Sequence, residues 1–75
     1  MQPRRRLLQV LQQHTDESGI TQGIISDIRG WIGSEGADWD IQSMIIAFWK
    51  EGCLLNKPYY LEGGDDEARF AVGVI

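Results

Sequence analysis

The residue types that most often carry out enzymatic chemistry are scarce in this 75-residue chain. His14 is the only histidine and Cys53 the only cysteine, so a Cys–His nucleophilic pair would require these two residues to meet across the fold. Asp65 and Asp66 are adjacent, but there is no second cluster that could complete a metal site with them. The glycine-flanked segment 30–33 does not match a phosphate-binding loop. The sequence therefore predicts no enzyme activity, cofactor, metal or small-molecule substrate.

Charged residues suggest a binding role, and their distribution is uneven. The chain has 7 Lys and Arg residues against 11 Asp and Glu residues, a net charge of −4. Arg4, Arg5 and Arg6 precede every acidic residue. Three cations near the positive end of a helix are mildly unfavourable, which hints at a phosphate or an acidic partner, although the run can equally be a soluble helix start. An acidic body with one basic end differs from the broad basic face of most DNA-binding domains.

Hydrophobic spacing predicts three helices that would position these charges. The first covers residues 3–14, the second roughly 22–32 and the third roughly 39–51. Thr21 and Asp38 are the expected N-caps of the second and third helices. Ile20 is expected to be extended, with a short strand there as an option, and Gly52 should end the third helix.

Beyond residue 52 the hydrophobic period changes from helical to alternating. Residues 55–61 and 69–74 then predict two strands, joined by the Gly- and Asp-rich segment 62–66 as a turn. Pro58 favours an edge strand or a bend.

A chain of this length can bury one small core, so residues 1–75 are expected to form a single domain. No run approaches 18 apolar residues, which predicts a cytoplasmic protein without a membrane span. The predicted core consists of Leu8, Leu11, Ile24, Ile28, Ile41, Ile45, Phe48 and Phe70.

The order of these elements resembles the winged helix-turn-helix superfamily over nearly the whole chain. Its most telling stretch is Ile45 to Leu55, IIAFWKEGCLL, where an apolar helix ends in Lys-Glu-Gly and leads into an apolar strand. The resemblance implies an α+β fold of three helices followed by a two-stranded β-hairpin wing. It also implies DNA binding in transcription regulation, with the third helix in the major groove and the wing on the DNA backbone.

Transferred to this chain, the resemblance implies that the groove would be read by Gln42, Ser43 and Lys50, whose side chains can hydrogen-bond base edges. Phosphates would be contacted by Arg4, Arg5, Arg6, Lys57 and Arg69. The sequence departs from the DNA-binding pattern at both contact points. Asp40 and the acids at residues 65–67 would repel phosphate, and the latter are expected to form a solvated turn at the wing tip.

An acidic protein-interaction module or adaptor is the alternative hypothesis. In a helix over 39–51, Trp39 and Ile46 fall on the face opposite the core, and a Trp that loses water on docking is a typical interface anchor. Asp40 belongs to an acidic rim that favours a partner with a basic border. Trp39 and Ile46 could instead pack against the second helix or the wing. A homodimer is compatible with either hypothesis, because a domain this small has a marginal core.

Overall fold

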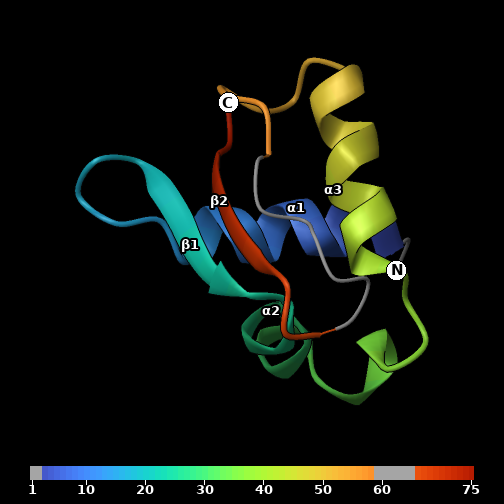
Figure 1. The fold of residues 1–75 in the computed structure, drawn as a ribbon. Helices are drawn as coiled ribbons and strands as arrows, with labels where there is room; N and C mark the ends of the chain where they lie inside the picture. Colours follow the sequence, from blue (N-terminus) through green and yellow to red (C-terminus); the bar gives the residue numbers. More distant parts are fainter. Residues whose placement is uncertain (1–2, 59–65) are drawn as a thin grey trace.

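Three helices and an antiparallel two-stranded sheet form the fold in the computed structural model, which describes residues 3–58 and 66–75 (Figure 1). The helices are α1 (Pro3–Gln13), α2 (Ile25–Ile32) and α3 (Ile41–Lys50), with a short 3-10 helix, η1 (Ser34–Gly36), before α3. The strands are β1 (Ile20–Ile24) and β2 (Arg69–Gly73). This confirms the predicted α+β class.

The sheet pairs β1 with β2 so that Thr21 lies opposite Val72. The chain after α3 runs along the other edge of β2. Leu54 bridges Val74, and the Leu55 N–H donates to the Gly73 carbonyl at 2.7 Å. The two arms of the predicted hairpin therefore run antiparallel near residues 54 and 74, whereas residues 59–65, with most of the predicted turn, lie outside the described residues. A strand at Ile20 is confirmed.

The second helix begins at Ile25, later than predicted, and Thr21 is not its N-cap. Thr21 lies in β1, fully buried, and its hydroxyl donates to the Leu11 carbonyl at 2.6 Å. Gly23 has a φ of +153°, which is far from helical. The apolar spacing predicts a helix over residues 22–32. Pairing with β2 instead makes residues 20–24 a strand, so the helix starts only at Ile25. The Asp27 carboxylate then accepts the Ile24 N–H at 3.0 Å where α2 starts.

The third helix is capped by Asp40 rather than Asp38. The Asp40 carboxylate accepts the Ser43 N–H at 3.3 Å and the Ser43 hydroxyl at 2.8 Å. This local bonding sets the helix start two residues later than predicted. At the other end, Gly52 has a φ of +82° and the Cys53 N–H donates to the Phe48 carbonyl at 2.9 Å. Gly52 ends α3 as predicted, because glycine adopts this left-handed conformation at little cost.

One hydrophobic core joins the three helices and β2. Six of the predicted core residues are buried, whereas Ile24 and Leu8 are half-buried and Ile25 and Leu7 take their places. The shift from Ile24 to Ile25 follows from the later start of α2. Leu7 is buried because it shares the inward face of α1 with Val10 and Leu11 at helical spacing. The buried apolar residues are Leu7, Val10, Leu11, Ile25, Ile28, Ile32, Ile41, Ile45, Phe48, Leu54, Ala68, Phe70 and Val72.

Candidate functional site

The candidate binding surface is the solvent-facing side of α3, which carries apolar residues. Ile41, Ile45 and Phe48 face the core. Ile46 and Trp49 each remain 37% exposed. The α3 outer face, as we define it, consists of the exposed helix residues Ser43, Ile46, Ala47, Trp49 and Lys50.

The structure places only part of the predicted interface set on this face. Ile46 belongs to it, and Asp40 is exposed at the start of the helix. Trp39 precedes α3, is half-buried and packs against the core. Its expected position on the exposed strip is therefore wrong, because the helix begins after it. The aromatic residue on the α3 outer face is Trp49. The sequence places Trp49 at the edge of the core stripe, next to Ile45 at i+4, and three residues after Ile46, so its exposure could not be predicted from spacing alone.

The start of α3 is held in place by Arg29 of α2. The Arg29 Nη1 donates to three backbone carbonyls, those of Gly36, Ala37 and Trp39, at 2.6 to 3.1 Å. Its Nε and Nη2 donate to the two carboxylate oxygens of Asp66 at 2.8 and 2.9 Å. One guanidinium thus fixes the segment before α3 and the segment before β2 relative to α2.

Asp66 was expected in a solvated turn, and the structure instead shows it in this ion pair. The paired hydrogen bonds from Arg29 lower the pKa of Asp66 and, in the same way, raise the pKa of Arg29. The Asp66 carbonyl also accepts the Ser26 N–H at 2.8 Å. The sequence separation of 37 residues between Arg29 and Asp66 explains why local patterning could not predict the contact.

Two of the three N-terminal arginines are engaged within the protein. Arg4 forms an ion pair with Glu51, and its guanidinium lies 5.6 Å from the centre of the Phe48 ring. Arg6 forms an ion pair with Glu35, N to O 3.3 Å. Arg5 is exposed and has no ion-pair partner among the described residues. Glu51 and Glu35 therefore offset two of the three positive charges at the start of α1.

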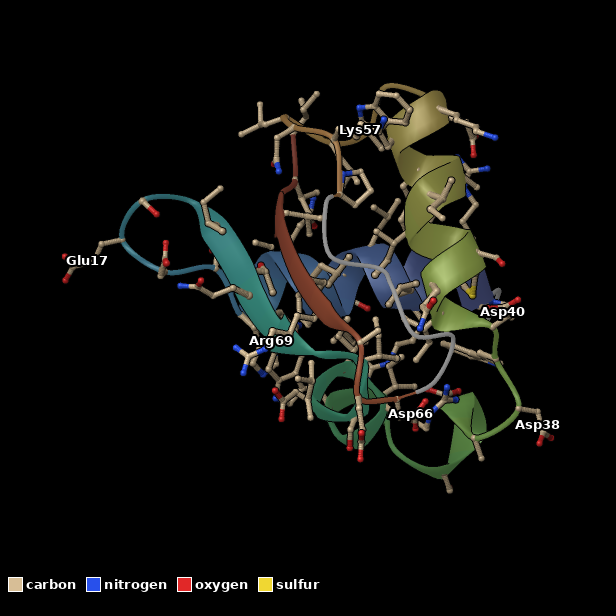
Figure 2. The ribbon with its side chains drawn as sticks, viewed as in Figure 1. Glu17, Asp38, Asp40, Lys57, Asp66 and Arg69 are labelled. Atoms are coloured by element: carbon tan, nitrogen blue, oxygen red, sulfur yellow. The ribbon has the colours of Figure 1, made fainter. Side chains whose placement is uncertain are left out.

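The remaining predicted phosphate ligands do not share one surface. Figure 2 shows Lys57 beside the far end of α3 and Arg69 lower in the view, on the side of the two strands. The Lys57 ammonium lies 5.5 Å from the centre of the Trp49 ring, beside the end of α3. Arg69 is exposed at the start of β2. The structure therefore brings Lys57 to the α3 outer face and leaves Arg69 away from it.

The three predicted groove readers differ in availability. Lys50 is exposed on the α3 outer face. Ser43 is also exposed, but its hydroxyl is bonded to the Asp40 cap. Gln42 is half-buried and lines a small pocket beside Arg29 and Asp66. A hydroxyl bonded to a carboxylate and a half-buried amide are poorly placed to reach a base edge.

The two residues weighed for nucleophilic chemistry have separate surroundings. The His14 ring stacks on Trp31 with 3.9 Å between ring centres and 9° between planes, and its Nδ1 lies 3.0 Å from the Val10 carbonyl. Cys53 is half-buried, and its N–H helps to end α3. Residues 3–58 and 66–75 contain no group of three or more His, Cys, Asp or Glu side chains that could hold a metal ion. None of the helices in these ranges has the length and hydrophobicity to cross a membrane.

Comparison with known proteins gives no relative. No protein-family model, curated protein or solved structure matches the chain.

Proposed function

We propose that this chain is a protein-interaction domain that binds its partner through the α3 outer face. The observation that supports this most directly is the 37% exposure of both Ile46 and Trp49 on one helix. A large aromatic ring beside an aliphatic side chain gains binding energy when both lose water against a partner. Neither Ile46 nor Trp49 is among the buried residues of α3 or part of the core cluster.

The charge distribution supports a protein partner over a nucleic acid. DNA contributes a dense row of phosphates, and proteins that bind it without specificity neutralise several phosphates with Lys and Arg. Here Arg4, Arg6 and Arg29 are paired with carboxylates, and the whole chain has a net charge of −4. Lys50 and Lys57 are the cations near the α3 outer face, and Asp40 is at the other end of the helix.

DNA binding is our second proposal, and it depends on the winged-helix resemblance. Lys50 is exposed on the third helix, the element that such proteins insert into the major groove. Arg5 and Arg69 could add phosphate contacts from α1 and β2. With few available cations, we expect any binding to be weak and to show a shallow salt dependence.

A capture experiment with two exposed-residue variants tests the first proposal. Three proteins are immobilised: the wild type, Ile46→Asp and Leu55→Asp. Each is exposed to an extract of the cells from which the wild-type chain comes. Leu55 is 66% exposed and lies outside α3, so its variant is a control that introduces the same charge away from the α3 outer face. We expect a protein partner that is retained by wild type and Leu55→Asp and lost with Ile46→Asp, while thermal melts stay unchanged.

The same three proteins are then titrated with random-sequence duplex DNA at low salt. Duplex binding by wild type together with equal protein capture by all variants would contradict the interaction proposal and favour DNA. Absence of duplex binding at low salt would remove the DNA proposal.

A further inference from the structure

We infer that the partner of the α3 outer face is a second copy of this chain, with the two α3 helices packed antiparallel about a two-fold axis. The inference rests on the proposed function, because it names the partner for the same face. It is carried by the way charge is ordered along α3 and by the apolar residues between the charged ends.

Opposite charges lie at the two ends of the α3 outer face. Asp38 and Asp40 are exposed where the helix begins. Lys50 is exposed at its last residue, and Lys57 lies beside Trp49 near that same end. Figure 2 shows Asp40 at the base of α3, Asp38 below it on the loop that leads from η1, and Lys57 next to the far end of the helix.

An antiparallel arrangement matches these ends to each other. Asp40 and Lys50 are ten residues apart, a separation of about 15 Å along a helix axis at 1.5 Å per residue. With a two-fold axis near Ile46, the acidic end of one α3 faces the basic end of the other, and both ion contacts form at once. A parallel pair would bring like charges together, which disfavours it.

The residues between the ends suit a close helix contact. Ile46 would pack near its own counterpart, and Trp49 would lie over Ser43 of the second copy. Ser43 and Ala47 are small and exposed, so they allow the helices to approach. A surface that is complementary to itself in this way forms a closed pair rather than an open chain of subunits.

The sheet offers a poorer route to self-association. At the outer edge of β1, the Ile20 N–H donates to the Asp16 carboxylate at 3.1 Å and the Ile24 N–H to the Asp27 carboxylate at 3.0 Å. Both ends of this edge are thereby occupied within the chain, which discourages addition of another strand. The second copy is therefore assigned to α3.

Sedimentation equilibrium of charge-reversal variants tests the inference. The wild type is measured from about 1 µM to about 1 mM, since a contact of one short helix belongs to the small, weak class of interfaces. Lys50→Glu replaces the cation at the C-terminal end of the face by an acid, so both ends are then acidic. Asp38→Lys replaces an acid at the N-terminal end by a cation, so this end is then less acidic. We expect each variant alone to raise the dimer dissociation constant at least tenfold. An equimolar mixture of the two should associate again, because each then meets an oppositely charged end.

Matched controls separate this effect from net charge. Arg69→Glu and Glu17→Lys carry the same charge changes away from α3, as Figure 2 shows, and should leave self-association unchanged. Thermal melts check that all four variants fold.

Two outcomes overturn the inference. One is a wild type that stays monomeric throughout the series, and the other is a set of α3 variants that associates no differently from the controls. Neither outcome decides the proposed function, which is tested separately by the capture and duplex-binding experiments with Ile46→Asp and Leu55→Asp.

Discussion

Single residues in this protein act chiefly by linking parts of the chain that are distant in sequence. Arg29 donates to carbonyls before α3 and to the carboxylate of Asp66 before β2. Three of its five guanidinium hydrogen bonds thus go to backbone and two to a carboxylate. Replacement of Arg29 by Lys would keep the charge but not this fork of donors.

Asp66 should make the stability of the protein depend on pH. The folded state lowers the pKa of Asp66, so the ion pair stabilises the fold above the unfolded value of about 3.9. That contribution is lost as the pH falls through the lower, folded pKa. We expect Asp66→Asn to melt at a lower temperature than wild type at pH 7 and to lose less further stability on acidification. Melting curves from pH 7 to pH 2 check this, and parallel profiles for the two proteins would refute it.

At the scale of elements, a buried side chain couples α1 to the sheet. The hydroxyl of Thr21 in β1 donates to the carbonyl of Leu11 near the end of α1. The Leu11 carbonyl lies in the last turn of the helix, where carbonyls lack an i+4 partner, and it accepts this bond together with a longer one from the His14 N–H at 3.3 Å. Thr21 is 0% exposed, so water cannot replace the hydroxyl.

Thr21→Val removes this hydrogen bond while keeping the side-chain shape. We expect a loss of about 1 kcal/mol in the free energy of unfolding, because the Leu11 carbonyl then keeps only its longer hydrogen bond, 3.3 Å from the His14 N–H. Thr21→Ser, which keeps the hydroxyl, should retain the hydrogen bond and lose only the methyl contacts. Urea unfolding of the three proteins measures the difference. Equal stability of the Val variant and wild type would show that the bond contributes nothing.

At the scale of the whole molecule, a single core makes folding cooperative. The buried residues of α1, α2, α3 and β2 form one cluster, and the molecule measures 28 × 28 × 23 Å. A small domain of this kind has a stability of roughly 5 kcal/mol, so one large core defect approaches the total. The exposed apolar residues of α3 lie outside this cluster.

Phe48→Ala should therefore unfold most of the protein. Phe48 is 1% exposed, and removal of a buried Phe side chain costs about 3–5 kcal/mol. Ile46→Ala, in the same helix but on its exposed face, is the control and should change stability by about 0.5 kcal/mol or less. Far-ultraviolet circular dichroism melts compare the two. A cooperative Phe48→Ala transition with only a small shift would contradict the central place of Phe48 in the core.

Periodicity and composition by themselves determined the helices, the single core and the α+β class. The apolar spacing of Ile41, Ile45 and Phe48 specifies which side of α3 is buried, and Gly52 specifies where it ends, because these signals act within one or two turns of helix. The same spacing predicts that Ile46 is exposed, since it lies opposite that stripe.

Tertiary structure decided the contacts that define the candidate site. Only pairing with β2 makes residues 20–24 a strand and turns Thr21 from a predicted cap into a buried hydroxyl. Because α3 starts only after Asp40, Trp39 lies before the helix, half-buried against the core, and Trp49 is the aromatic residue of the α3 outer face. Arg4 and Arg6 could be counted as free cations from the sequence, but Glu51 and Glu35 reach them across the fold. Hydrophobic periodicity acts over neighbouring turns, whereas ion pairs and strand register depend on residues tens of positions apart, and only the folded chain brings those residues together.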